Sequence, residues 1–212
     1  DKGEIFINQY VQPAKKNFDK IIAHGYSKFY QNIFKNFKND KLNILEIGSF
    51  YGNASAALYF YFKNSKIFVA DINPDMFKYT SKRIKSFYVN SSDANSISKE
   101  IILQNYSFDI IIEDASHMLK DQIISLFLLF PIIEPGGYFI IEEIDFPETR
   151  EDMRANQELP DLKSILKSIL DKKDFNSVYI DNNSKKYFLE NFEEIKFFKG
   201  NLNEIAIIKK KW

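Results

Sequence analysis

The stretch that decides the fold is Asn43-Ile44-Leu45-Glu46-Ile47-Gly48-Ser49-Phe50-Tyr51-Gly52. Its apolar first half predicts a buried strand, and its second half holds two glycines at G-x-x-x-G spacing. Residues 54–62 then have the composition of a helix. A strand, a glycine turn and a helix in this order predict a Rossmann-like α/β fold, with the turn at the carboxyl edge of its sheet.

The rest of the chain continues this alternation. We expect further strands at 66–70, 86–89, 108–113 and 138–141, and helices at 74–83, 121–133 and 162–170. Strands that alternate with helices form a parallel sheet. The runs 195–198 and 204–208 flank a loop with a glycine and predict an antiparallel pair. A reversed last strand is typical of the class I methyltransferase fold, so we expect a mostly parallel sheet with a C-terminal antiparallel hairpin.

The composition and charge of the chain exclude several classes of protein. The chain has 212 residues, of which 45% are hydrophobic, enough for one compact core. Its 29 basic and 29 acidic residues cancel, and no basic block interleaves with aromatic residues, so no nucleic-acid partner is expected. Without an apolar run of about 18 residues or a leader sequence, we expect neither a membrane span nor a signal peptide, and a cytoplasmic location. The absence of cysteine excludes disulfides and thiolate metal sites.

The glycine turn predicts a ligand site. Gly48 and Gly52, with Ser49 between them, lie where a ligand must approach the backbone without meeting a side chain. The spacing is not the G-x-G-x-x-G of a pyrophosphate cradle, which disfavours a dinucleotide. S-adenosylmethionine (SAM) has no phosphate and needs no such cradle. The alternative interpretation is that both glycines only make a turn.

Acidic residues at the strand ends strengthen the SAM interpretation. Asp71 ends the second predicted strand, where a carboxylate accepts hydrogen bonds from a ribose diol. Asp93 follows the third strand and is placed to accept from an adenine amino group. Glu46 precedes the glycine turn. Their order along the chain, each at a strand end, predicts SAM binding, with NAD as the competitor.

Chemistry is expected after the strand at 108–113, in Glu113-Asp114-Ala115-Ser116-His117. A histidine has a pKa of about 6.5 and can deprotonate a hydroxyl near neutral pH. Asp114 and the pair Glu142-Glu143, which ends the neighbouring strand, are expected to converge beside His117. Crowded carboxylates repel one another unless a cation joins them, and oxygen ligands favour Mg²⁺, Mn²⁺ or Ca²⁺. Two alternatives stay open: a histidine that caps a helix, and acidic residues that are merely exposed.

The stretches Phe108 to His117 and Phe130 to Glu143 resemble the macrocin and mycinamicin sugar O-methyltransferases, a class I, metal-dependent family. The resemblance includes Asp1-Lys2-Gly3 and His24-Gly25-Tyr26 and extends to about Asp145. It implies that His117 is the general base and that Mg²⁺ is held by Asp114, Glu142 and Glu143. It also implies that SAM contacts Glu46, Gly48, Asp71 and Asp93, and we expect Asp114 to face the cofactor as well.

The chain departs from that family in two places. The usual D-D-G-S-H motif reads Glu113-Asp114-Ala115-Ser116-His117, and the usual E-D pair reads Glu142-Glu143. Alanine tightens the turn, and the longer glutamate alters the metal shell. The tail after Asp145, including Arg150, matches nothing in the family and is expected to form part of the acceptor pocket.

The expected organisation is a helical cap over residues 1–40, with two helices between Pro13 and Phe37, and one SAM-binding domain over residues 41–212. The expected function is SAM-dependent methylation of a hydroxyl on a sugar or sugar-containing small molecule. A homo-oligomer is compatible with such an enzyme. The alternatives are a metal-independent methyltransferase, a non-catalytic nucleotide-binding module and an NAD-dependent oxidoreductase. His24 either lines the site or lies on a surface turn; the surface turn is the favoured interpretation.

Overall fold

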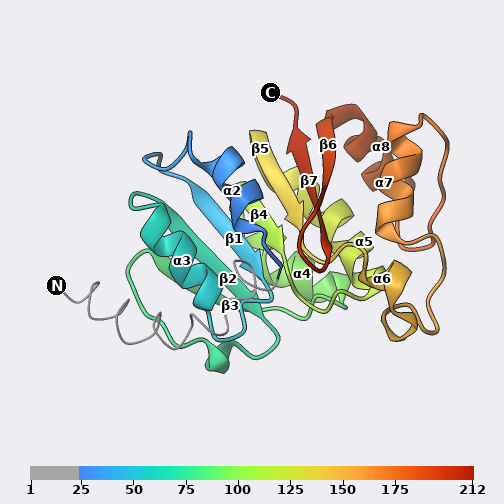
Figure 1. Ribbon diagram of the computed structural model, residues 1–212. Helices are drawn as coiled ribbons and strands as arrows, with labels where there is room; N and C mark the ends of the chain where they lie inside the picture. The colour runs from blue at the N-terminus through green and yellow to red at the C-terminus, as the bar shows by residue number, and fades with distance from the viewer. Residues whose placement is uncertain (1–23) are drawn as a thin grey trace.

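The computed structural model describes residues 24–212, and its centre is one sheet of seven strands (Figure 1). The strands are β1 (Asn43–Ile47), β2 (Lys66–Asp71), β3 (Ile84–Tyr88), β4 (Phe108–Glu113), β5 (Ile133–Ile141), β6 (Phe192–Lys199) and β7 (Glu204–Lys210). Their order is β3-β2-β1-β4-β5-β7-β6. Strands β1 to β5 pair in parallel, and β7 lies antiparallel between β5 and β6. The mostly parallel sheet with a reversed C-terminal hairpin is confirmed.

Helices cover both faces of this sheet. They are α2 (Ser27–Phe34), α3 (Asn53–Tyr61), α4 (Ala94–Glu100), α5 (Leu119–Leu129), α6 (Phe146–Thr149), α7 (Leu162–Leu170) and α8 (Asn182–Asn191), with short 3₁₀ turns at Pro74–Met76, Ile102–Gln104, Phe130–Ile132 and Glu151–Met153. The part of the expected cap before His24 lies outside the described residues. Among the described helices, none is both long and apolar enough to cross a membrane.

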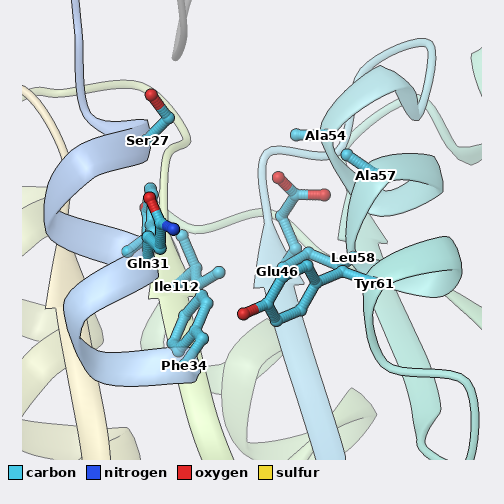
Figure 2. Close-up of a pocket in the computed structure, with 10 residues that line it drawn as sticks. Ser27, Gln31, Phe34, Glu46, Ala54, Ala57, Leu58, Tyr61 and Ile112 are labelled. Atoms are coloured by element: carbon cyan, nitrogen blue, oxygen red, sulfur yellow. The ribbon is translucent and has the colours of Figure 1, made fainter. Parts of the chain in front are cut away.

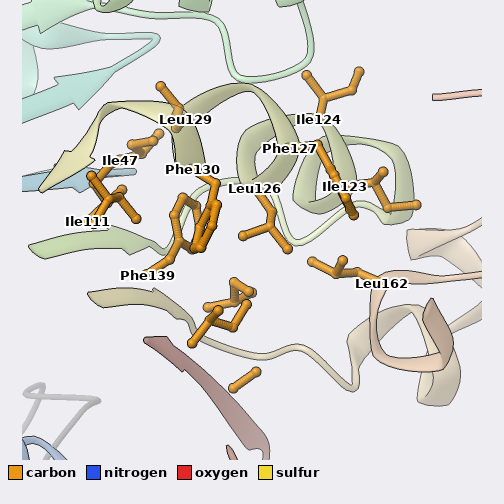
Figure 3. Close-up of a cluster of buried hydrophobic side chains, with 14 of the residues drawn as sticks. Ile47, Ile111, Ile123, Ile124, Leu126, Phe127, Leu129, Phe130, Phe139 and Leu162 are labelled. Carbon is orange, nitrogen blue, oxygen red and sulfur yellow. The ribbon is translucent and has the colours of Figure 1, made fainter. Parts of the chain in front are cut away.

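The core has two halves, one on each face of the sheet. Ile111 of β4 packs on one side with Leu126 and Phe130 of the α5 region, in the cluster that Figure 3 shows. Ile110 and Ile112 point to the opposite side, into the cluster that includes residues of α2 and α3. A strand that is covered on both faces needs apolar side chains at successive positions. This explains why residues 108–113 form a nearly continuous apolar run.

The prediction of a helix at residues 74–83 is wrong. Only Pro74–Met76 form a 3₁₀ turn, and the chain then runs irregularly into β3. Tyr79 is buried, and its hydroxyl donates a hydrogen bond to Asn53 Oδ1 at 3.0 Å, at the start of α3. Phe77 packs against Gly52. These contacts with the glycine turn override the local helical pattern.

Strand β5 begins earlier than expected. The expected helix at 121–133 ends at Leu129, and the segment 134–137, expected to be a turn, belongs to β5. The pairing with β4 shifts register between Phe108 and Ile110, and a side chain at Gly137 would meet the Asp109 carbonyl oxygen at 2.6 Å. Glycine therefore permits close approach within the sheet here, and the β-bulge replaces the predicted turn.

Candidate active site

The glycine turn is held tightly between two strand ends. Gly48 has φ +87°, and its N–H donates to the Ala70 carbonyl oxygen at 2.8 Å. A Cβ at this position would lie 2.0 Å from the Asp114 carbonyl oxygen. Gly52, with φ +83°, precedes α3 and packs against Phe77. Both the left-handed backbone and the contact with the Asp114 carbonyl group, just after β4, therefore require glycine at position 48.

Asp71 lies at the carboxyl end of β2, as expected, and is held by two backbone donors. Its Oδ2 accepts from Phe50 N and its Oδ1 from Asn73 N, each at 2.8 Å. It borders a cavity of about 340 Å³, here named the Asp71 cavity, lined by Ile47, Gly48, Phe50, Asp71, Ile72, Val89, Asn90, Ser91, Ser92, Asp114, Ala115 and Ser116. The apolar side chains of Ile72, Val89 and Ala115 suit the faces of a planar base.

A second cavity adjoins the first across the glycine turn. This His117 cavity has a volume of about 220 Å³ and is lined by His24, Glu46, Gly48, Ser49, Phe50, Tyr51, Asn53, Ala54, Asp114, His117, Glu142, Glu143 and Phe146. Gly48, Phe50 and Asp114 line both cavities. The two cavities therefore adjoin at the glycine turn, with Asp71 bordering one and His117 the other.

His117 lies between two carboxylates. Its Nε2 is 3.8 Å from Asp114 Oδ1, and its Nδ1 is 3.7 Å from Glu143 Oε2. The residue has φ +57°, and its ring packs edge-on against Phe146. Asp114, His117 and Glu143 each offer a ligand atom, and these atoms lie within 4.8 Å of one another. The predicted base and two of the three predicted metal ligands therefore meet in one cluster.

The segment that leads into α2 reaches the ends of β5. His24 Nδ1 lies 3.0 Å from Glu143 Oε1, and the Tyr26 hydroxyl donates to the same oxygen at 3.4 Å. The Tyr30 hydroxyl donates to Glu142 Oε1. Burial, with the charge of Glu143 as the next cause, raises the pKa of Tyr26 well above its usual range. His24 therefore lines the site rather than a surface turn, and Tyr30 is a site residue that the sequence did not identify.

Glu113 supports the loop from beneath. It is fully buried, and its Oε1 accepts from Ala115 N at 3.3 Å. Burial, followed by the charge of Asp114, raises the pKa of Glu113 to about 8. A carboxyl with this pKa is mostly neutral at pH 7. Glu113 thus adds little negative charge next to Asp114 and Glu143.

The donor set fits a hard divalent cation. Asp114 and Glu143 offer carboxylate oxygens, and Glu142 lines the same cavity. The buried Nδ1 of His117 has no hydrogen-bond partner among residues 24–212. Such a cluster of negative charge is stabilised by a bound cation. Glu142 differs from the other two acids in being bonded to Tyr30 and absent from the tight cluster.

Glu46 links the site to a third cavity. It is buried, and its Oε2 accepts from Ser55 Oγ of α3. Figure 2 shows its carboxylate between α2 and α3, and Glu46 lines a largely apolar cavity of about 300 Å³ there. Glu46 and Ala54 line both this cavity and the His117 cavity, and Ser49 is buried in the turn between Gly48 and Gly52.

Two residues expected to take part in ligand binding, Asp93 and Arg150, do not line these two cavities. Asp93 lines neither the Asp71 nor the His117 cavity; it is exposed and caps α4, accepting from Asn95 N at 2.9 Å. The cap occupies one of its two carboxylate oxygens, Oδ1. Of the tail after Asp145, Phe146 lines the His117 cavity, whereas Arg150 is exposed and pairs with Asp152 at 2.7 Å.

The strand order, the reversed β7 and the glycine turn define a class I methyltransferase fold. Residues 38–196 match the family described as the methyltransferase domain, and the chain belongs to this family.

Curated relatives confirm the resemblance seen in the motifs. The chain is 27% identical to demethylmacrocin O-methyltransferase of Streptomyces fradiae over 128 residues, covering 57% of this chain and 32% of that protein. It is 29% identical to mycinamicin VI 2''-O-methyltransferase of Micromonospora griseorubida over 129 residues, with 57% and 32% coverage. The matched region is thus about a third of the length of these relatives.

A solved structure shares the fold. It is MycE methyltransferase from the mycinamycin biosynthetic pathway, in complex with Mg, SAH and mycinamycin VI. The TM-score is 0.71 at 21% identity, covering 90% of this chain and 50% of the other. The predicted class I fold is therefore confirmed over nearly the whole described chain.

Proposed function

We propose that this chain transfers a methyl group from SAM to a hydroxyl oxygen of a sugar or sugar-containing small molecule. The observation that carries the proposal is a pair of adjoining cavities at the glycine turn, one bordered by Asp71 and the other by the cluster of Asp114, His117 and Glu143. The relatives are named as O-methyltransferases, which supports an oxygen acceptor. The resemblance of the motifs to sugar O-methyltransferases supports a sugar as its carrier.

The adenosine of SAM fits the Asp71 cavity. Asp71 is held so that it can accept hydrogen bonds from the ribose diol, and Ile72 and Val89 can contact the base. The glycine turn leaves room for the sulfur to pass over Gly48. The sulfonium methyl would then point toward the His117 cavity, where the acceptor oxygen binds.

His117 would act as the general base. The acceptor oxygen attacks the methyl carbon, the C–S bond breaks, and its electron pair stays on sulfur, which yields S-adenosylhomocysteine. The proton of the hydroxyl passes to an imidazole nitrogen of His117. Asp114 and Glu143, on either side of the ring, stabilise the imidazolium that results. Because the reaction needs in-line approach, the chain's main task is to position the two reactants.

Asp114, Glu142 and Glu143 would hold a divalent cation, with Mg²⁺ the best match to oxygen ligands. A bound cation would lower the pKa of a coordinated acceptor hydroxyl. Tyr30 and His24 would orient Glu142 and Glu143 from the α2 side.

Calorimetric titration of SAM, with and without Mg²⁺, tests this function. We expect the parent chain to bind SAM at micromolar concentration and to show a separate Mg²⁺ binding event. Asp114→Ala should lose the Mg²⁺ event, whereas Asp152→Ala, which removes an exposed acid away from the site, should keep both. If the parent does not bind SAM, the proposal is wrong.

A metal-independent methyltransferase is the second candidate. The observation in its favour is that His117 already has a carboxylate facing each ring nitrogen. These two charges alone can orient the imidazole and stabilise its protonated form. Turnover that survives removal of divalent cations with a chelator would favour this candidate over the metal-assisted one.

A further inference from the structure

A buried carboxylate lies behind the wall of the Asp71 cavity. Asp121, in the first turn of α5, is only 3% exposed. Its Oδ2 accepts from Ser92 Oγ at 2.5 Å and from Ser116 Oγ at 2.6 Å. Both serines line the cavity, and they come from different loops, one after β3 and one after β4. Asp121 therefore joins two walls of the cavity from outside it.

These hydrogen bonds fix the direction of both hydroxyls. An ionised carboxylate can only accept hydrogen bonds, so each serine hydroxyl donates its single proton to Asp121. The Ser116 oxygen also accepts from Met118 N at 3.2 Å, which uses one of its two lone pairs. The remaining lone pairs of the Ser92 and Ser116 oxygens can then accept hydrogen bonds from a ligand. At Ser92 and Ser116, the wall thus presents hydrogen-bond acceptors and no hydroxyl donor.

We propose that Asp121 is a positioning residue that makes this chain selective for a 6-aminopurine, because it forces Ser92 and Ser116 to accept hydrogen bonds from the ligand. This inference rests on the proposed function, which places the adenosine of the cofactor in the Asp71 cavity. The amino group of adenine donates hydrogen bonds, and the oxygen at the same position of hypoxanthine only accepts. A 6-oxopurine would therefore set oxygen lone pairs against oxygen lone pairs.

Asn at position 121 would change this selectivity. Both serines bond to the same oxygen of Asp121, Oδ2, so an Asn whose amide nitrogen takes that place donates a hydrogen bond to each of them. Each serine is then free to turn its own proton toward the cavity, where it can donate to a 6-oxo group. The volume of the residue hardly changes, so the effect on the fold is expected to be small.

The test compares binding of S-adenosylhomocysteine with that of S-inosylhomocysteine, which differs in the purine 6-substituent and its N1 proton. We expect the parent chain to prefer the adenosine compound by at least about tenfold, because the wrong base leaves polar groups unpaired. In Asp121→Asn the preference should fall to within about threefold, chiefly through tighter binding of the inosine compound. Ser125→Ala, four residues further along α5 and also buried, serves as the control and should keep the parent's preference.

The outcomes separate this inference from the proposed function. If the parent binds neither compound, both fail. If the parent binds both equally, or if Asp121→Asn weakens both by the same factor, the proposed function stands and the selectivity role of Asp121 is refuted. Should Asp121→Asn fail to fold, Ser92→Ala gives the answer, because Ser92 is exposed. This variant should bind the adenosine compound several-fold more weakly and the inosine compound at least as tightly as the parent.

Discussion

At the residue scale, the site depends on a few side chains held in unusual positions. His117 and Glu143 both have positive φ, at +57° and +47°. Non-glycine residues adopt this conformation at some cost, which surrounding contacts must offset. In both cases the residue follows the end of a strand and turns its side chain into the His117 cavity. The backbone geometry therefore helps to bring the imidazole and the carboxylate together.

The role of His117 can be tested by His117→Asn, which keeps a polar side chain of similar reach. We expect turnover to fall by about 10²- to 10⁴-fold, because the acceptor hydroxyl would lose its proposed base. SAM affinity should change by less than about threefold, since the proposed place of the adenosine is the Asp71 cavity. Single-turnover rates and calorimetry give the two numbers. Full turnover in this variant would exclude His117 as the base.

At the scale of elements, α2 and its lead-in hold the ends of β5 from more than 100 positions away in the sequence. The Tyr30 hydroxyl bonds to Glu142, and Tyr26 and His24 contact Glu143. Ser55 of α3 likewise bonds to Glu46 of β1. The helices on this face thus provide hydrogen-bond donors to acids that the strand ends expose. Without them, several buried carboxylate oxygens would lose their partners.

Tyr30→Phe tests this arrangement. Losing a hydrogen bond to a charged group should reduce the free energy of unfolding by about 1–3 kcal/mol and lower turnover, because Glu142 is no longer oriented. Urea unfolding and steady-state rates measure the two effects. Tyr59→Phe is the matched control, since its hydroxyl bonds to Ser81 away from the site. If both variants lower turnover equally, Tyr30 has no specific role there.

At the scale of the whole molecule, the two ends of the parallel strands differ. The candidate site lies at their carboxyl ends, whereas the contacts at their amino ends join one strand to another. There Asp109 Oδ2, at the start of β4, accepts from Asn43 N at 2.8 Å, at the start of β1. Burial raises the pKa of Asp109 above its ordinary value of 3.8. The folded state therefore holds a proton on this group more tightly than the unfolded state.

The sign of the pH effect follows from this shift. The stability that Asp109 contributes is fully present below pH 3.8 and is lost as the pH rises through its higher folded-state pKa. Asp109→Asn keeps an oxygen for Asn43 N and does not ionise. Its free energy of unfolding relative to the parent should therefore rise between pH 3.5 and neutral pH, as measured by urea unfolding at each pH. A flat or falling difference would contradict this prediction, and SAM affinity should not change.

Most of the fold could be predicted from the sequence because its signals are local. Buried strands such as Asn43–Ile47 and Phe108–Glu113 are short apolar runs, and the turn after the first of them is marked in the sequence by Gly48 and Gly52. A local signal also gave a wrong prediction. Residues 74–83 have a helical pattern but do not form a helix, because Phe77 and Tyr79 contact the glycine turn and the start of α3. The polar helix Ala94–Glu100, of which only Ile97 is buried, had no clear apolar pattern to predict it.

The sequence by itself determined which motif follows which strand. It also determined that Asp114, His117 and Glu143 lie close together, because residues that follow neighbouring parallel strands lie at the same edge of the sheet. Only the tertiary structure decided which further side chains join them. His24 and Tyr30 reach the acids of β5 across the fold, Asp93 turns to cap a helix, and Asp121 takes a place behind the cavity wall. The physical reason is that the direction of a side chain depends on packing and hydrogen bonds between elements that are distant in the sequence.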